Sequence, residues 1–432
     1  MTFWLDKVCL FSMNRHCTAF NLGLLLSVFF SLSSQSTLAG DYADSAHGDA
    51  SIGVDRSSIN TDFSNYATGN CAHCHEQHAS LNGPTGGPND YLLFDVTNNN
   101  LFCNTCHDGS PVTGDVASQT TMTSGHNPAT TKTPGNITAV CMDCHDPHAA
   151  TEVAHVEATD GNTASGVLKN VAGVTATGWS TPPPPSAGNE TLTGPSYTAT
   201  NVITKEYELC LKCHSSYAFG ATPPTGWTDQ GQEFNPYNFA FHPVTESTPG
   251  QQWNNAYIRA NQTTAMAGNW ALPTNLDARM HCSDCHGDDT GGAPQGPHGS
   301  NSAYILRATG PGNSYDNLCL LCHNPTSSSA FGNHTTGQHT YGGGNLLGCV
   351  ACHAGPVGNY GGRRGNIHGT NYQWADSTAG KKTYVGLPSQ VFLVGGYVYA
   401  LGAQGTSRYC QASDSTAGVN DGGCGGHGPK SF

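Results

Sequence analysis

Cys141-Met142-Asp143-Cys144-His145 is the stretch that decides how this chain folds, because its Cys-x-x-Cys-His pattern occurs seven times in 432 residues. The first cysteines of the seven copies are Cys71, Cys103, Cys141, Cys210, Cys282, Cys319 and Cys349. The second cysteines are Cys74, Cys106, Cys144, Cys213, Cys285, Cys322 and Cys352. The histidines that follow are His75, His107, His145, His214, His286, His323 and His353. This pattern is typical of covalent attachment of a c-type haem.

The chemistry of attachment explains the spacing of the three residues. Two thiols add to the two vinyl groups on one edge of the porphyrin, and an imidazole on the same side reaches the iron. Positions i, i+3 and i+4 share one face of a helical turn, so one short turn presents all three groups. Half of a zinc site or a redox dithiol also uses Cys-x-x-Cys, but neither requires the histidine. We therefore expect seven covalently bound haem c groups, each with its motif histidine as proximal ligand.

Histidines outside the motifs are numerous enough to give each iron a second axial imidazole. Methionine, the alternative axial ligand, is scarcer, with six residues in the whole chain. The candidates for the distal position are His47, His78, His126, His148, His242, His298, His334, His339 and His368. The supply of histidine therefore favours bis-histidine coordination throughout.

The sequence around these candidates separates them further. Turn-forming neighbours surround His47 and His126, and glycine or proline adjoins His242, His298 and His368, so a loop can bring each imidazole against a porphyrin face. His78 and His148 follow a proximal histidine by three residues and cannot reach the opposite face of the same haem. They would bind a neighbouring haem or lie at the surface.

The local sequence supports a ligand role less well for the remaining histidines. His334 and His339 compete for one further ligand role. His73 and His281 lie within or beside a cysteine pair; either could serve a neighbouring haem, but packing or contact with solvent is favoured for both. His155 is expected to be a polar surface residue.

The composition favours a chain with little regular structure. Hydrophobic residues make up only 37%, while glycine and proline number 54 and 24, which is too poor a supply for a large ordinary core. Flat apolar porphyrins would replace much of that core. We expect a mostly irregular polypeptide wrapped around a chain of seven haems, with short α-helices at the motifs and a few β-hairpins.

The predicted divisions are a signal peptide at 1–39, a three-haem module at 40–180, a proline-rich spacer at 181–186, a four-haem module at 187–370 and a haem-free tail at 371–432. The spacer favours either a polyproline II boundary or a stiff surface loop within one domain. A strand is expected within Val167 to Trp179. The tail contains a predicted hairpin at 389–401 and, between Cys410 and Cys424, a predicted disulfide.

The N-terminal 39 residues indicate export. Lys7 and Arg15 precede an apolar run, and Thr37-Leu38-Ala39 offers a small-residue cleavage site; a start at Met13 would give a more compact signal. The apolar run is too short to span a membrane, so no span is expected after cleavage. The net charge of −14 argues against a nucleic-acid partner. We expect a secreted protein, extracellular or at the cell surface, with the periplasm as the alternative.

With these motifs, the chain resembles the multihaem c-type cytochromes of the doubled Cys-x-x-Cys-His family, which includes outer-surface cytochromes of Geobacter-type metal-reducing bacteria. The resemblance rests on the motifs, on His145-Asp-Pro-His148, on Cys285-His286 leading to Pro297-His298-Gly299, and on Phe241-His242-Pro243. It implies electron transfer along closely packed bis-histidine haems. The implied partners are other c-type cytochromes and an extracellular metal oxide or electrode-like acceptor. Some members assemble into conductive filaments, which makes self-assembly a candidate property here.

The alternative is a multihaem reductase acting on nitrite, hydroxylamine or a sulfur oxyanion. Such an enzyme requires one haem with an open axial position, which related nitrite reductases often mark by lysine in place of the motif histidine. All seven motifs here end in histidine. The sequence therefore favours an electron-transfer protein over an enzyme.

Overall fold

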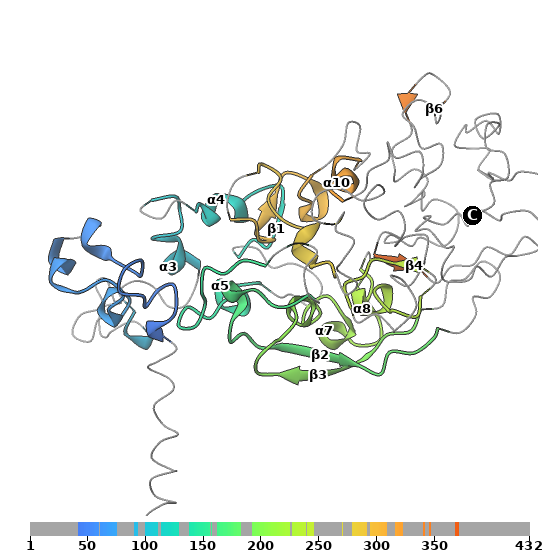
Figure 1. The fold of residues 1–432 in the computed structure, drawn as a ribbon, viewed down its shortest axis with the longest axis horizontal. Coiled ribbons are helices and arrows are strands. Elements are labelled where there is room, and N and C mark those ends of the chain that lie inside the picture. The colour runs from blue at the N-terminus through green and yellow to red at the C-terminus, as the bar shows by residue number, and fades with distance from the viewer. Residues whose placement is uncertain are drawn as a thin grey trace, which may run out of the picture. The chain divides into compact units, whose positions relative to one another are not determined.

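The structure is a computed structural model, drawn in Figure 1, that describes only part of the chain. The described residues are 42–59, 61–75, 90–93, 100–110, 114–128, 138–155, 157, 162–182, 192–224, 227–238, 240–245, 270, 279–291, 294–308, 316–322, 340–341, 345–346 and 368–370. The predicted signal peptide, the motif at Cys349, the 389–401 hairpin and the Cys410–Cys424 disulfide lie outside these ranges.

The described residues fall into two compact units. One contains those up to Cys74 together with Pro147–Thr151, and the other contains the rest. The predicted modules divide the chain at a different place, the 181–186 spacer, of which residues 183–186 are not described. The three-haem and four-haem modules therefore stay predictions.

The first unit is built from three 3₁₀ helices, η1 (Arg56–Ser58), η2 (Thr61–Asn65) and η3 (Cys71–His73). Arg56 is buried and lies 3.9 Å above the ring of Phe63. Its backbone N–H donates to Nδ1 of His73, and its guanidinium donates to the His73 carbonyl. Nε2 of the fully buried His73 donates to the Ala67 carbonyl. His73 thus packs inside the protein, with both ring nitrogens engaged.

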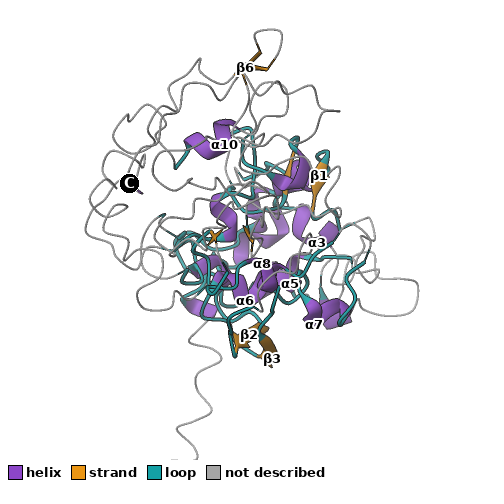
Figure 2. Cartoon of the chain, turned by 90° about the vertical axis from the view of Figure 1, so that its right-hand side faces the viewer, coloured by secondary structure: helices purple, strands orange, loops and turns teal. Residues whose placement is uncertain are grey.

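The second unit contains short helices and strands of two to five residues. Helices are purple and strands orange in Figure 2. The helices are η4 (Asp90–Leu92), α3 (Asn100–Asn104), α4 (Val116–Thr120), α5 (Cys141–Cys144), η5 (Gly166–Leu168), α6 (Glu206–Cys210), α7 (Ser216–Phe219), α8 (Gln230–Glu233), η7 (Cys282–Asp284), η8 (Ala303–Ile305) and α10 (Asp316–Leu320). The strands are β1 (Ser124–Gly125), β2 (Gly173–Thr177), β3 (Ser196–Thr200), β4 (Ala240–Phe241), β5 (Gly299–Ser300), β6 (Thr340–Tyr341), β7 (Asn345–Leu346) and β8 (Gly369–Thr370).

The strands form antiparallel pairs, β1 with β5, β2 with β3, β4 with β8, and β6 with β7. β2 lies within the stretch predicted as a strand, Val167 to Trp179, but it begins only at Gly173. Val167 and Leu168 instead belong to η5. Only the later part of the predicted stretch is therefore extended.

Motif cysteines pack against the main hydrophobic core of this unit. The core side chains are Val174, Tyr207, Leu211, Phe234, Val244, Trp270 and Met280, and Cys282, Cys285 and Cys322 contact them. Val174 on β2 is fully buried. The fold thus anchors the fifth and sixth motifs on the core.

Candidate haem-binding sites

The first cysteine of each motif from Cys71 to Cys319 lies in a short helix, and four of these motifs share the same backbone turn. The histidine N–H donates to the carbonyl of the first cysteine at 2.9–3.0 Å in the motifs of His107, His145, His214 and His286. This α-helical bond places the imidazole at the end of the turn that carries both thiols. In α5 and η7 the acidic residue inside the motif also caps the helix, since Asp143 accepts from Val140 N–H and Asp284 from His281 N–H.

Three proximal imidazoles are oriented by a hydrogen bond from Nδ1 to a backbone carbonyl further along the chain. His75 Nδ1 donates to Tyr91 O at 2.8 Å, His145 Nδ1 to Val167 O at 2.9 Å, and His286 Nδ1 to Tyr304 O at 2.7 Å. Metal-binding histidines typically donate one ring N–H to a carbonyl or carboxylate, which fixes the tautomer and directs the other nitrogen at the metal.

Four predicted distal histidines use the same nitrogen in the same way. The Nδ1 contacts are His47 with Pro147 O at 3.0 Å, His126 with Pro297 O at 2.7 Å, His298 with Gln119 Oε1 at 3.2 Å and His368 with Glu233 Oε2 at 2.8 Å. Donation from Nδ1 leaves Nε2 as the nitrogen that carries a lone pair. This is the protonation state that an axial haem ligand requires.

The histidines predicted to have no ligand role bond through the other nitrogen. Nε2 is the nitrogen that donates in His73, in His155 to Asp284 Oδ1 at 2.9 Å, and in His281 to Thr163 O at 3.0 Å. His73 and His281 are buried, as expected for packing roles. The expectation for His155 was wrong, because it is half-buried and stacks on His281 with ring centroids 4.1 Å apart.

Three predicted proximal histidines each lie near a predicted distal histidine. The ring centroids are 6.1 Å apart for His145 and His298, 6.1 Å for His214 and His126, and 6.0 Å for His286 and His368. With metal–nitrogen bonds of about 2 Å, two imidazoles on opposite faces of one metal have centroids roughly 6 Å apart. The donor chemistry and the spacing of these pairs therefore fit a bis-histidine iron.

Partial burial keeps four of the paired imidazoles neutral, those of His126, His214, His286 and His298. It lowers the pKa of His214 to about 3, with the positive fields of nearby histidines adding to the effect. It also lowers the pKa of His286 and of His298 to about 4 each, and it lowers the pKa of His126. A neutral imidazole is the form that binds metal, so these side chains need no proton removed near neutral pH.

Two strand pairs hold predicted distal ligands in register. β1 pairs with β5 so that His126 N–H donates to His298 O at 3.0 Å just beyond the strands. β4 pairs with β8, and His242 N–H donates to His368 O at 2.9 Å. Each pair of strands thus fixes two histidines at once, an arrangement that no local sequence pattern indicates.

Successive motifs lie beside one another. Cys103 contacts Cys141, and Cys210 contacts Cys282. Cys210 also lies close enough to Cys144, and Cys322 to Cys285, to act electrostatically on it. Burial, together with the nearby Cys210, raises the pKa of Cys144 to about 12. The second to sixth motifs therefore follow one another in space in their sequence order.

The acceptors of the proximal imidazoles were missed by sequence reasoning. Tyr91 and Tyr304 both have positive φ, 58° and 63°, as do Leu92 and Ile305 after them, which is costly for bulky side chains. Both tyrosines are exposed large side chains, at 74% and 58%. The sequence does contain a shared signal for these acceptors. A Tyr-Leu-Leu or Tyr-Ile-Leu triplet begins 16 residues after His75 and 18 residues after His286.

Fewer contacts of the other predicted ligands are described. The ring of His148 lies 5.9 Å from that of Tyr42, and His107 ends its motif turn as described above. The predicted site residues outside the described ranges are His78, His323, His334, His339, His353, Cys349 and Cys352.

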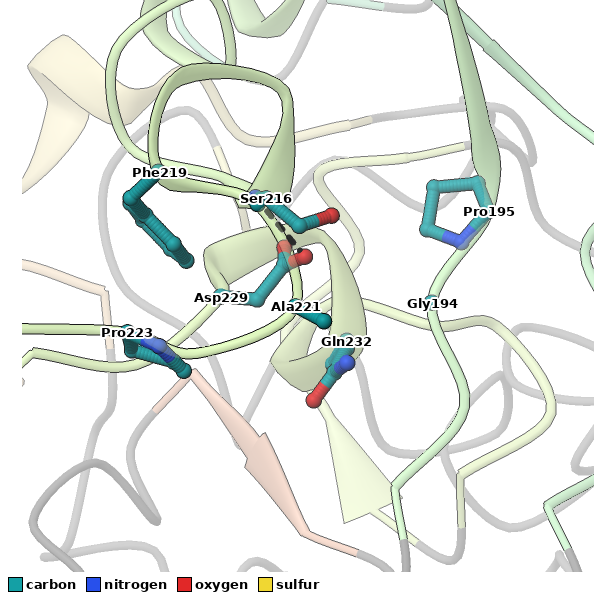
Figure 3. A pocket seen from close by; sticks show the side chains of 9 residues that line it. Gly194, Pro195, Ser216, Phe219, Ala221, Pro223, Asp229 and Gln232 are labelled. Carbon is teal, nitrogen blue, oxygen red and sulfur yellow. Dashed lines mark hydrogen bonds between the residues drawn. The ribbon is translucent and has the colours of Figure 1, made fainter.

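A cavity of about 330 Å³ lies beside α7 and α8, but its chemistry does not suit a haem. Figure 3 shows Ser216, Phe219, Asp229 and Gln232 around it. Both carboxylate oxygens of Asp229 are engaged, one by Tyr197 OH and Gly231 N–H and the other by Ser216 N–H. Among the described residues its lining includes no histidine or cysteine, so it offers no iron ligand.

Comparisons of the chain with family models, curated proteins and solved structures found no match. None of the helices in the described ranges combines the length and the hydrophobicity of a transmembrane segment.

Glu233 is a buried carboxylate that accepts a hydrogen bond from Nδ1 of His368 at 2.8 Å, so its charge should affect the potential of the haem that His368 binds. A negative acceptor makes the imidazole more electron-rich and favours ferric iron. Glu233→Gln keeps an acceptor but removes the charge, so the potential of one haem should rise by tens of millivolts, where about 59 mV equals a tenfold change in equilibrium. Spectroelectrochemical titration of wild type and variant measures the shift; an unchanged titration curve would contradict it.

The reciprocal variant is Gln119→Glu, which places a carboxylate against Nδ1 of His298. It should lower the potential of a different haem. Because Gln119 Nε2 also donates to Pro294 O at 3.0 Å, the haem content of this variant is measured first.

Proposed function

We propose that the chain is a multihaem c-type cytochrome whose function is electron transfer. The observation that supports this best is the set of three imidazole pairs, His145 with His298, His214 with His126, and His286 with His368, at 6.0–6.1 Å. The twelve described motif cysteines and their histidines are the residues that would hold haem c. Haem c, when bound, supplies reversible one-electron chemistry at iron.

The residues of the chain perform three tasks in this proposal. The motif turns present thiols and a proximal imidazole together, and the Nδ1 hydrogen bonds orient each ring. Desolvation of the partly buried His214, His286 and His298 keeps these imidazoles neutral. Two imidazoles per iron leave no coordination position for a substrate, which favours electron transfer over reduction of a bound molecule.

The proximity of successive motifs supports a continuous path for electrons. Cysteines of the second to sixth motifs lie close to one another in sequence order, so redox centres attached there would be neighbours. We further propose that the protein is exported, exchanges electrons with other c-type cytochromes, and serves an extracellular metal oxide or electrode-like acceptor. Assembly of copies into filaments belongs to the same proposal and rests on the resemblance alone.

The experiment that tests the proposal is the intact mass of the protein purified from a host that matures c-type cytochromes. We expect the mass of the exported polypeptide plus seven haems, because all seven motifs are intact. The haems should stay attached in denaturant, since thioether bonds do not depend on folding. A chain that carries no covalent haem would overturn the proposed function, and a smaller number would correct the haem count.

A further inference from the structure

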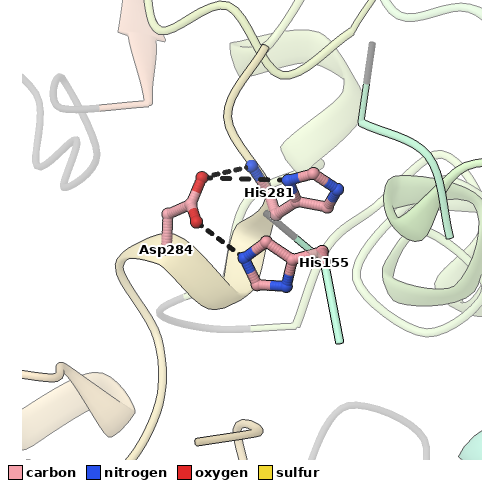
Figure 4. Close-up of side chains that lie close together, drawn as sticks. All are labelled: His155, His281 and Asp284. Carbon is pink, nitrogen blue, oxygen red and sulfur yellow. Dashed lines mark hydrogen bonds and ion pairs between the residues drawn. The ribbon is translucent and has the colours of Figure 1, made fainter. Parts of the chain in front are cut away.

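A cluster of three ligand-type side chains lies outside the proposed haem ligands. It consists of His155, His281 and Asp284, whose potential ligand atoms all lie within 4.8 Å of one another. Figure 4 shows the two imidazoles stacked on one side of the carboxylate, with Asp284 turned toward both. The ring centroids are 4.1 Å apart, too close for two imidazoles on opposite faces of one iron.

One ring nitrogen in this cluster is buried without a hydrogen bond. His281 is 2% exposed, and its Nε2 donates to Thr163 O at 3.0 Å, so Nδ1 carries a lone pair. Among the described residues, Nδ1 has no hydrogen-bond partner. It lies 3.9 Å from Asp284 Oδ2, which is an acceptor and cannot donate to it when ionised. A buried lone pair facing a carboxylate is stabilised by a cation.

The charges around the cluster also favour a cation. Asp284 is 4% exposed, and Glu206 and Glu157 lie close enough to act electrostatically on His155. Glu157 is bridged by Arg307 at 3.0 Å, whereas Glu206 accepts from the N–H and hydroxyl of Ser283. Negative charge thus exceeds positive charge around Asp284.

The carboxylate and the imidazole are already held in position. Asp284 Oδ2 accepts from the backbone N–H of His281 at 2.7 Å, and Oδ1 accepts from His155 Nε2 at 2.9 Å. The carbonyl of Thr163 fixes the tautomer of His281 in the way that outer hydrogen bonds fix metal ligands.

We propose that His155 Nε2, His281 Nδ1 and Asp284 form a binding site for one divalent transition-metal cation, distinct from the haem irons. Two imidazoles and a carboxylate suit zinc, with a fourth position open to water. Binding replaces the His155–Asp284 hydrogen bond, and the Nε2 proton of His155 leaves by tautomerisation to Nδ1 or release to solvent.

The test uses the purified holoprotein and zinc alone. The protein is equilibrated with zinc chloride, and excess zinc is removed by gel filtration. Elemental mass spectrometry then measures the zinc bound per polypeptide chain. We expect one zinc per chain. His155→Gln keeps a donor for Asp284 but removes the imidazole, so its zinc affinity should fall at least about tenfold.

Glu157→Gln is the matched control, because it removes a nearby charge without removing a ligand, and it should retain zinc. Haem content and circular dichroism show that each variant is folded. The proposal is overturned if the wild type retains no zinc, if His155→Gln retains as much as the wild type, or if both variants lose zinc equally. Failure of the haem proposal would be seen as a missing haem mass, whereas failure of the zinc proposal would be seen as missing zinc per polypeptide chain. The two failures can therefore be told apart.

Discussion

Replacing His298 with alanine is expected to convert one haem per chain from low-spin to high-spin. The ring of His298 lies 6.1 Å from that of His145, and its Nδ1 is held by Gln119 at 3.2 Å. Removal of this imidazole leaves the iron held by His145 with one protein ligand. A weaker ligand field at that iron favours the high-spin state, which visible absorption and electron paramagnetic resonance detect.

The same reasoning extends to the other pairs. His126→Ala should affect the haem of His214, and His368→Ala the haem of His286, because their centroids are 6.1 and 6.0 Å apart. The double variant His126→Ala/His298→Ala should give two high-spin haems. Exogenous imidazole should restore the low-spin spectrum in each variant by occupying the space of the lost side chain.

The control is His427→Ala, which removes a histidine that belongs to no motif and to no predicted pair. It should leave the spectrum unchanged. If His298→Ala shows only low-spin haem at full haem content, the pairing with His145 is wrong. A wild-type ferric protein that already contains a high-spin haem and binds nitrite or cyanide would favour the reductase alternative.

The motif turns could be predicted from sequence because their geometry is local. Both cysteines and the histidine lie within five residues, and the bond from His145 N–H to Cys141 O closes a single helical turn. The use of Asp143 and Asp284 as caps is equally local. Nothing further along the chain is needed to position the thiols.

The pairing of distal ligands could not be predicted in the same way, since it depends on distant parts of the chain. His126 bonds to a carbonyl 171 positions away, and His368 to a carboxylate 135 positions away. The sequence indicated His126, His298 and His368 as candidates from their glycine and proline neighbours. It could not show which proximal histidine each one faces.

His155 is an instructive failure. No turn-forming residue adjoins it in sequence, yet it lies against Asp284 and His281, which are more than a hundred residues further along the chain. Local composition predicts exposure only where the fold brings no other segment over the residue. The same limit applies to the carbonyls of Tyr91 and Tyr304, whose role depends on their backbone conformation.

Gly299→Ala is expected to disturb two haems with a single methyl group. Gly299 is in β5, next to His298, and a Cβ there would collide with the backbone carbonyl of Gln119. Relief requires β5 or α4 to move, and such overpacking costs roughly 1–3 kcal/mol. Movement of β5 displaces His298 and also the carbonyl that accepts from His126 N–H at 3.0 Å.

The expected result is therefore partial high-spin character at the haems of both His145 and His214, whereas His126→Ala should affect the haem of His214 alone. Gly114→Ala is the matched control, because its Cβ would make only an ordinary contact with Pro294 at 3.6 Å. Gly114→Ala should keep the wild-type spectrum and melting temperature. Identical spectra for Gly299→Ala and wild type would mean that the β1–β5 pairing does not position the ligands. The imidazoles of His126 and His298 would then be held by their Nδ1 hydrogen bonds alone.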